Sequence, residues 1–249
     1  MQNFFYLARN LSVIGMNYSN KSSVYEGGET EVMKMLAKRF NENRAYIVFD
    51  VGANEGEYCT ELLENIRIKD LQVYCFEPSG HAFGKLKSKH GSVPGVLLNN
   101  FGFSNKIDRM ALYSNTPGSP IASLFPLERP FGADEPLLDF EMVEIITIDH
   151  FLAESKISSV DFLKLDVEGN ELNVLLGASQ SIGSGKIKAI QFEFGTCNID
   201  SRTFFRDFWN LLSPRYNIYR VLKNGMYPIT FYNELDEVFA TINYFAELK

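Results

Sequence analysis

The stretch Val48-Phe49-Asp50-Val51-Gly52-Ala53-Asn54-Glu55-Gly56 decides the fold of this chain. Residues 46–49 are apolar and partly β-branched, a pattern that predicts a buried parallel strand. In residues 57–66 the apolar side chains recur at helical spacing. A strand that runs through a glycine turn into a helix forms the ligand site of many α/β sheets, because glycine lets the backbone approach a ligand and the helix start offers free N–H groups. The stretch therefore predicts an α/β fold with a small-ligand site at this turn.

The spacing of the glycines narrows the kind of ligand. A dinucleotide-binding turn has the pattern G-x-G-x-x-G, in which the second glycine leaves room for a pyrophosphate. Asn54 occupies that position, and only Gly52 and Gly56 remain. The turn suits a ligand with an amino-acid moiety and a nucleoside but no phosphate, such as S-adenosylmethionine. Asp50 at the strand end can accept hydrogen bonds from loop amides or from the amino group of this ligand. A glycine-bearing turn without a ligand is the alternative.

The composition is that of an ordinary globular protein, with 45% hydrophobic and 22% charged residues in a chain of 249. This length suits one α/β domain, or one domain with an extension. A net charge of −7 disfavours general nucleic-acid binding, because an acidic surface repels phosphate backbones. No segment approaches the roughly 20 apolar residues of a transmembrane helix, so no integral membrane segment is expected.

The cysteines and the N-terminus indicate the cellular compartment. Cys59, Cys75 and Cys197 are odd in number and lack CxxC spacing, which favours reduced packing residues over disulfides or a metal cluster. The N-terminus has no basic segment followed by an apolar core, so no signal peptide is expected. These features predict a cytoplasmic protein.

Residues 1–45 are expected to form an N-terminal helical extension ahead of a main domain of residues 46–249. Residues 29–40 form an amphipathic segment, and an earlier set of apolar residues also follows helical spacing: Phe4, Leu7, Ala8 and Leu11. Such stripes are typical of packing surfaces. Attachment of the first helix to a membrane surface is a weaker alternative, because Arg9 is its only basic residue.

The second and third predicted strands each lead into polar residues. Glu77 follows the strand of residues 72–76, roughly 20 residues beyond the glycine turn, where an acid accepts both ribose hydroxyls of an adenosine. A helix N-terminal acid that complements the helix dipole is the structural alternative. The strand of residues 96–99 leads into Asn100 and Gly102, which are expected beside the adenine.

Residues 105–148 interrupt the alternation of strands and helices. Residues 110–113 and 143–147 are predicted to be paired strands. Residues 115–141 between them hold five of the nine prolines, and loops of this length are usually functional lids or disordered linkers. Several apolar residues favour a lid that covers a substrate: Ile121, Leu124, Phe125 and Phe131.

The fourth and fifth predicted strands end in acidic residues. Lys164, Asp166, Glu168 and Glu171 lie within eight residues, and Glu193 lies near the end of the next strand. Charges at the carboxyl end of a central strand lie in the ligand crevice, where a buried carboxylate is costly unless it is used. A solvated strand-to-helix turn is the alternative, and it has most weight for Glu168 and Glu171.

The C-terminal part of the chain predicts a β-hairpin. Residues 216–222 and 226–231 flank Asn224-Gly225, the strongest short hairpin signal. Five parallel strands followed by such a hairpin match the strand plan of a common methyltransferase fold. We therefore expect a Rossmann-like class I methyltransferase fold with a central, mostly parallel seven-stranded sheet and helices on both faces.

Three motifs together resemble the FkbM-type methyltransferases: VFDVGANEG at residues 48–56, Phe76-Glu77-Pro78, and FLKLDVEGNELNVL at residues 162–175. The resemblance covers about residues 26–245 and departs at Phe101-Gly102, where a small and a β-branched residue are expected. It implies an S-adenosylmethionine-dependent O-methyltransferase with S-adenosylhomocysteine as product. The acceptor would be a natural product or a sugar, and the C-terminal region is most similar to members associated with bacterial polysaccharide biosynthesis.

The motifs and the chemistry give an expected site. The cofactor-binding residues are expected to be Asp50, Gly52, Asn54, Gly56, Glu77, Asn100, Gly102 and Asp166. A sugar hydroxyl is a poor nucleophile, so a general base or a metal-bound alkoxide is expected. Asp166 is the first candidate for catalysis, followed by Glu193 and Glu168, with Lys164 as their partner. Three carboxylates also suit Mg²⁺, although no residue is assigned to a metal.

Other functions fit parts of the sequence. An NAD(P)-dependent nucleotide-sugar oxidoreductase would use a Tyr-x-x-x-Lys pair, and Tyr219 and Lys223 have that spacing. That pair must share one face of a helix, whereas these residues fall in a predicted strand. A non-catalytic cofactor-binding subunit of the same fold is a further alternative, which the intact glycine turn, Glu77 and Asp166 disfavour. His150 is an alternative base, although a lone histidine there is more often a surface residue.

Overall fold

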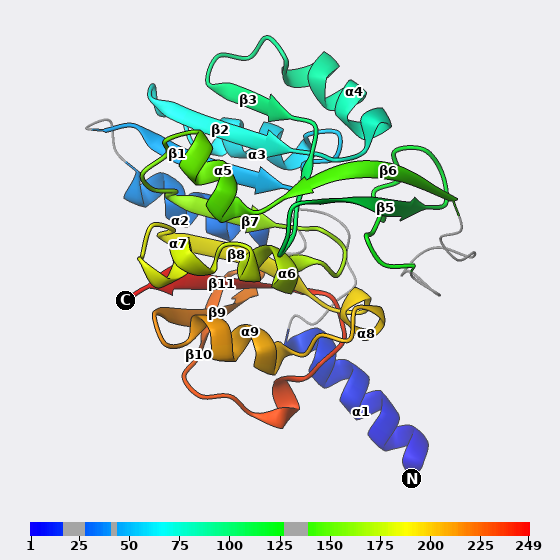
Figure 1. Cartoon of the computed structure of the whole chain (residues 1–249). Coiled ribbons are helices and arrows are strands. Elements are labelled where there is room, and N and C mark those ends of the chain that lie inside the picture. The colour runs from blue at the N-terminus through cyan, green and yellow to red at the C-terminus, as the bar shows by residue number, and fades with distance from the viewer. Residues whose placement is uncertain (17–27, 41–43, 127–138) are drawn as a thin grey trace.

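The computed structural model describes residues 1–16, 28–40, 44–126 and 139–249. Its centre is an eight-stranded sheet with the order β10-β9-β11-β8-β7-β1-β2-β3 (Figure 1). A three-stranded sheet, β4-β6-β5, lies at the end toward which the parallel strands point. The chain therefore has the expected mixed α/β architecture.

Five parallel strands form one half of the central sheet: β3 (Val96–Asn99), β2 (Leu71–Phe76), β1 (Tyr46–Val51), β7 (Phe162–Leu165) and β8 (Ala189–Phe194). They are short apolar runs, and β7 is buried at every position, as expected for strands covered on both faces. Val51 lies opposite Leu165 in the register of β1 and β7. The loops after these two strands therefore leave the sheet side by side.

The other half of the sheet contains β9 (Tyr216–Leu222), β10 (Gly225–Ile229) and β11 (Ile242–Leu248). β9 and β10 form the predicted hairpin. β11 lies between β8 and β9 and is antiparallel to both. The sheet thus has eight strands instead of the expected seven. The additional strand is β11, whose partners lie far away along the chain, so that no local pattern reveals its pairing.

Helices cover both faces of the central sheet, as expected. One face and its buried core are covered by α2 (Glu29–Arg39), α3 (Glu57–Asn65) and α4 (Gly80–His90). The other face is covered by α5 (Ile148–Glu154), α6 (Glu171–Leu176), α7 (Ser179–Gly183) and α9 (Phe205–Leu212). Two short helical turns complete the described elements: α8 (Cys197–Asp200) and η1 (Glu234–Asp236).

The inserted segment forms the second sheet. β5 (Asp108–Ser114) and β6 (Asp139–Ile146) are antiparallel, which confirms the predicted pairing, and β4 (Gly102–Phe103) adds a short parallel strand. Leu112, Val143 and Ile145 form a small core on one side of this sheet. Residues 127–138, including Phe131, lie outside the described part of the chain.

The N-terminal helix α1 (Gln2–Gly15) differs from α2 in its packing. α2 buries Val32, Met33 and Leu36 against the sheet, whereas α1 has no buried residue and extends away from the body (Figure 1). In the described part of the chain, no helix combines the length and the apolar character needed to cross a membrane. A domain boundary near residue 45 stays a prediction.

Candidate active site

The turn after β1 has a backbone that glycine alone can adopt without strain. Gly52 has φ of +79°, and an added Cβ would lie 1.8 Å from the backbone oxygen of Asp166. Gly56 has φ of +84°, and its missing side chain admits His90 and Leu86 of α4. The turn is therefore held close to the loop after β7 on one side and to α4 on the other.

Glu77, at the end of β2, is buried beside this turn. Its two carboxylate oxygens accept hydrogen bonds from the backbone N–H groups of Asn54 and Ser79, each at 2.8 Å. Burial raises the pKa of Glu77 to about 7. A carboxylate oxygen can accept a further hydrogen bond, so Glu77 keeps the capacity to bind hydroxyl groups.

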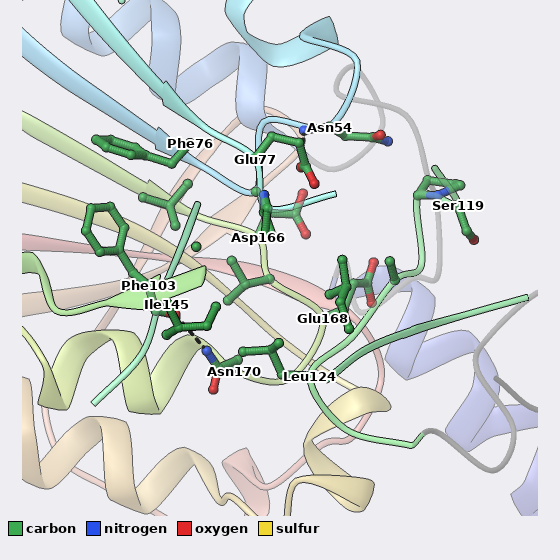
Figure 2. A pocket seen from close by; sticks show the side chains of 18 residues that line it. Asn54, Phe76, Glu77, Phe103, Ser119, Leu124, Ile145, Asp166, Glu168 and Asn170 are labelled. Carbon is green, nitrogen blue, oxygen red and sulfur yellow. Dashed lines mark hydrogen bonds between the residues drawn. The ribbon is translucent and has the colours of Figure 1, made fainter. Parts of the chain in front are cut away.

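A cavity lies in front of these strand ends, and Glu77, Asp166 and Glu168 contribute carboxyl groups to its wall (Figure 2). Three parts of the chain line it: the ends of β1 and β2, the second sheet with its insertion, and the loop after β7. The lining residues are Val51, Gly52, Asn54, Phe76, Glu77, Pro78, Gly102, Phe103, Leu112, Ser119, Pro120, Ala122, Leu124, Ile145, Asp166, Val167, Glu168 and Asn170.

Of the two residues expected beside an adenine, Gly102 and Asn100, one lines the cavity and the other does not. Gly102 lines the cavity, and a Cβ at this residue would lie 2.8 Å from Cδ1 of Ile145. Asn100 is not among the lining residues; its Nδ2 donates to the backbone oxygens of Glu77 at 2.9 Å and Pro78 at 3.2 Å. Asn100 therefore fixes the loop that carries Glu77.

Lys164 lies between two of the predicted acids. Its Nζ is 3.3 Å from Oδ1 of Asp50 and 3.3 Å from Oδ2 of Asp166. Lys164 and Asp50 are buried, whereas 41% of the Asp166 side chain is exposed. Of these three residues, Asp166 is therefore the one that faces the cavity. The buried Lys164 forms an ion pair with it.

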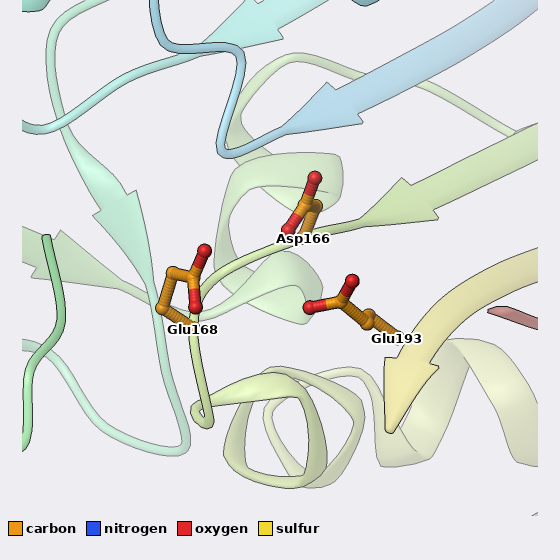
Figure 3. A group of neighbouring side chains, drawn as sticks. All are labelled: Asp166, Glu168 and Glu193. Carbon is orange, nitrogen blue, oxygen red and sulfur yellow. The ribbon is translucent and has the colours of Figure 1, made fainter. Parts of the chain in front are cut away.

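Among the described residues, Asp166, Glu168 and Glu193 form a cluster at the carboxyl ends of β7 and β8 (Figure 3). Each offers an oxygen atom, and these atoms all lie within 4.8 Å of one another. Burial and the nearby charge of Asp166 raise the pKa values of both Glu168 and Glu193. The cluster could accept a proton or, with its oxygen ligands, hold a divalent cation.

The loop between Asp166 and α6 has a strained and well-anchored backbone. Glu168 and Gly169 have φ values of +51° and +99°. The Glu171 carboxylate accepts hydrogen bonds from the N–H groups of Val167 at 2.9 Å and Gly169 at 3.1 Å. Glu171 therefore anchors this loop, whereas Glu168 lines the cavity and accepts a hydrogen bond from Sγ of Cys197 at 3.0 Å.

The inserted segment contacts the same loop. Oγ of the buried Ser123 donates to the backbone oxygen of Glu168 at 2.6 Å, and Ser123 also pairs with Tyr113 of β5. Ser119 and Leu124 on either side of it line the cavity. The described part of the insertion thus forms one wall of the cavity, as the lid hypothesis requires.

Several residues that line the cavity, and one buried acid behind it, were not predicted from the sequence. Phe103, Ile145 and Asn170 line the cavity, but each reads as an ordinary core or turn residue in the sequence. Glu29 of α2 is buried, and its Oε1 accepts a hydrogen bond from Nε2 of Gln191 at 2.8 Å. It lies close enough to Lys164 to raise the pKa of that lysine. In the sequence Glu29 resembles a surface acid of a first helical turn.

Residues of the alternative hypotheses lie elsewhere. His150 is exposed on α5 and is not among the residues that line the cavity. Tyr219 belongs to β9 and Lys223 follows it, so the pair does not share a helix. The geometry required for the Tyr-x-x-x-Lys pair of an oxidoreductase is therefore absent at these two residues.

The strand order and the acid-lined cavity beside a glycine turn are those of a Rossmann-like methyltransferase fold. Residues 50–221 match the family described as the methyltransferase FkbM domain. The chain therefore belongs to this family. The family implies S-adenosylmethionine as the methyl donor, and the described residues fit it, since Gly52, Asn54 and the carboxyl group of Glu77 line one cavity.

Two curated relatives are methyltransferases by their names. Hexuronic acid methyltransferase AglP of Haloferax volcanii is 24% identical over 170 residues, which cover 68% of this chain and 64% of the relative. The 2-O-methyltransferase NoeI of Sinorhizobium fredii is 23% identical over 144 residues, covering 55% and 58%. The matched region thus spans less than two thirds of each relative.

One solved structure is also similar to this chain, at lower sequence identity. The FkbM methyltransferase from Methylobacillus flagellatus is 19% identical, with a TM-score of 0.49 over 81% of this chain and 43% of that chain.

Proposed function

We propose that this protein transfers a methyl group from S-adenosylmethionine to a hydroxyl group of a sugar or glycan. One observation carries the proposal: a single cavity is lined by Glu77 from β2 and by Asp166 and Glu168 from the loop after β7. In a sheet of this order, the first position suits a ribose and the second suits the reacting groups. The two curated relatives, named for a hexuronic acid and for 2-O-methylation, support a sugar acceptor.

The residues divide into two groups under this proposal. Gly52, Asn54 and Glu77 would hold the donor, because they line the cavity around the turn after β1. Gly102, which also lines the cavity, would lie beside the adenine, whereas Gly56 and Asn100 would act by fixing the loops. Asp50 is buried against Lys164 and would act on the donor's amino group.

Methyl transfer forms a bond from the acceptor oxygen to carbon while the bond from carbon to sulfur breaks. The acceptor loses its proton, and Asp166 is the proposed recipient because it is exposed to the cavity. Lys164 would be a positioning residue that orients Asp166, and Glu168 and Glu193 would share the proton or orient the acceptor. In-line positioning in a site shielded from water contributes most of the rate.

The same three carboxylates offer the oxygen ligands that Mg²⁺ prefers, so they would hold this ion in the alternative route, in which the metal would supply Lewis-acid activation of the acceptor hydroxyl. A methyl-transfer assay with and without chelator separates the two. Full activity in the presence of chelator supports direct proton transfer, whereas loss of activity that Mg²⁺ restores supports the metal.

The acceptor is proposed to belong to bacterial surface polysaccharide biosynthesis, as the C-terminal resemblance implies; a cytoplasmic location and the absence of nucleic-acid binding stay predictions. The direct test is transfer of labelled methyl groups to a panel of nucleotide sugars, glycans and RNA. Methylation of a sugar hydroxyl supports the proposal. Labelling of RNA alone, or reduction of NAD without methyl transfer, contradicts it.

A further inference from the structure

A row of polar side chains crosses the central sheet just behind the cavity. Asp50 of β1 pairs in register with Lys164 of β7, which pairs in turn with Gln191 of β8. Register neighbours in a parallel sheet point to the same face, so these three side chains lie together. All three are buried. Gly52 and Asp166, two residues farther along the same strands, line the cavity.

Two helices cover this row and add polar groups to it. Glu29, in the first turn of α2, is buried and hydrogen-bonded to Gln191 at 2.8 Å. Tyr58 of α3 places its ring 4.9 Å from Nζ of Lys164. The row is therefore enclosed by α2 and α3 rather than open to water.

The enclosed group has more negative than positive charge. Within the described residues, the buried acids Asp50 and Glu29 and the partly exposed Asp166 all interact with one lysine, Lys164. A buried carboxylate is costly without a matching positive charge. Burial accordingly raises the pKa of Glu29 to about 7. The group is thus suited to receive an additional cation.

The same group contains buried polar atoms without hydrogen bonds. Within the described part of the chain, the Tyr58 hydroxyl and Oδ2 of Asp50 have no hydrogen-bond partner, and Oδ1 of Asp50 has only the ion-pair contact with Nζ of Lys164 at 3.3 Å. Tyr58 is 5% exposed and Asp50 fully buried, so water does not replace the missing partners at the surface. Such orphan atoms are rare in folded proteins and indicate a ligand or an ordered water.

We propose that Glu29, Tyr58 and Asp50 bind the charged amino-acid end of the methyl donor, with α2 supplying an acid that the glycine-turn motif does not include. The α-ammonium group would lie among Glu29 and Asp50, and the Tyr58 hydroxyl would donate to the α-carboxylate. This inference rests on the proposed function, because it assumes a donor that has both a nucleoside and an amino-acid end.

Calorimetry with two ligands separates the amino-acid end from the nucleoside. S-adenosylhomocysteine has both parts, whereas methylthioadenosine has the nucleoside and the thioether alone. Glu29→Gln is expected to weaken S-adenosylhomocysteine about tenfold, the effect of losing one charge-assisted hydrogen bond, and to leave methylthioadenosine unchanged. Tyr58→Phe is expected to do the same without loss of folding stability, because the hydroxyl it removes has no partner to lose.

Two control variants complete the experiment. Glu31→Gln changes a half-buried acid of the same helix, paired with Lys34, and is expected to alter neither affinity. Glu77→Gln is expected to weaken both ligands, because both have the ribose. If Glu29→Gln and Tyr58→Phe weaken both ligands equally, or neither, while Glu77→Gln acts as expected, the inference is wrong and the proposed function stands. If the unaltered protein binds neither ligand, the proposed function itself fails.

Discussion

At the residue scale, Gly52 is the described glycine whose surroundings leave the least room for a side chain. Its φ of +79° and the contact of 1.8 Å that a Cβ would make with the Asp166 backbone exclude a side chain. Any substitution must move the turn after β1 away from the loop after β7. Because both loops line the cavity, the geometry of the site depends on this one glycine.

Gly52→Ala is therefore expected to lower the free energy of unfolding by about 2 kcal/mol or more, since strain and a backbone clash add. Gly183→Ala is the matched control, because Gly183 ends a helix and a Cβ there would meet nothing within 4 Å. Urea denaturation measures both variants. Equal stability of Gly52→Ala and the unaltered protein would show that the turn is not constrained as described.

Asp166 is the residue on which the proposed chemistry depends. Asp166→Asn is expected to reduce kcat by roughly 10² to 10⁴, the usual contribution of a general base, while S-adenosylhomocysteine still binds. Asp108→Asn, an exposed acid paired with Lys106, is the control. Full turnover in the Asp166 variant would remove it from the proton-transfer step.

At the scale of elements, Ser123 joins the insertion between β5 and β6 to the loop after β7. Its hydroxyl donates to the Glu168 backbone and accepts from the N–H of Phe125 at 3.1 Å. These contacts hold Ser119 and Leu124 against the cavity. The wall formed by the insertion is therefore stabilised by Ser123 and by a small apolar core against which Ala122 and Leu124 pack.

Ser123→Ala is expected to weaken this attachment by about 1 to 2 kcal/mol, because a buried carbonyl loses its donor. Hydrogen exchange of residues 119–125 should become faster while the strands of the central sheet stay protected. Thr116→Ala, at an exposed position of the same segment, is the control. Unchanged exchange in the Ser123 variant would mean that other contacts hold the insertion.

Local patterns predicted the elements whose partners lie nearby in the chain. Asn224-Gly225 indicated the β9–β10 hairpin, and the charges from Lys164 to Glu171 indicated the loop at the cavity. β11 was missed as the eighth strand, because it pairs with β8 and β9 through long-range contacts. Glu29 was missed because an acid in a first helical turn ordinarily lies in water, and its burial depends on where α2 packs.

At the scale of the whole molecule, buried acids link stability to pH. Burial raises the pKa values of Glu29, Glu77 and Glu171 to about 7, whereas an unfolded glutamate titrates near about 4.3. Between these two values the folded chain binds more protons than the unfolded chain. The stabilising contribution of these groups is therefore complete below about pH 4.3 and is lost as the pH rises through about 7.

The free energy of unfolding of the ligand-free protein is accordingly expected to fall between about pH 5.5 and about pH 7.5. Glu171→Gln keeps a neutral side chain at every pH and should make this fall smaller by up to roughly 1.4 kcal/mol per pH unit. Urea denaturation at several pH values checks the slope. A free energy that rises with pH over this range, or a slope that Glu171→Gln leaves unaltered, contradicts the assignment.

The central claim is that the cavity beside the glycine turn binds a methyl donor rather than a dinucleotide. Titration calorimetry of the unaltered protein with S-adenosylhomocysteine and, separately, with NAD is the most direct measurement. We predict saturable binding of S-adenosylhomocysteine with about one site per chain and a dissociation constant on the order of micromolar, and no binding of NAD. Binding of NAD without binding of S-adenosylhomocysteine would contradict the claim.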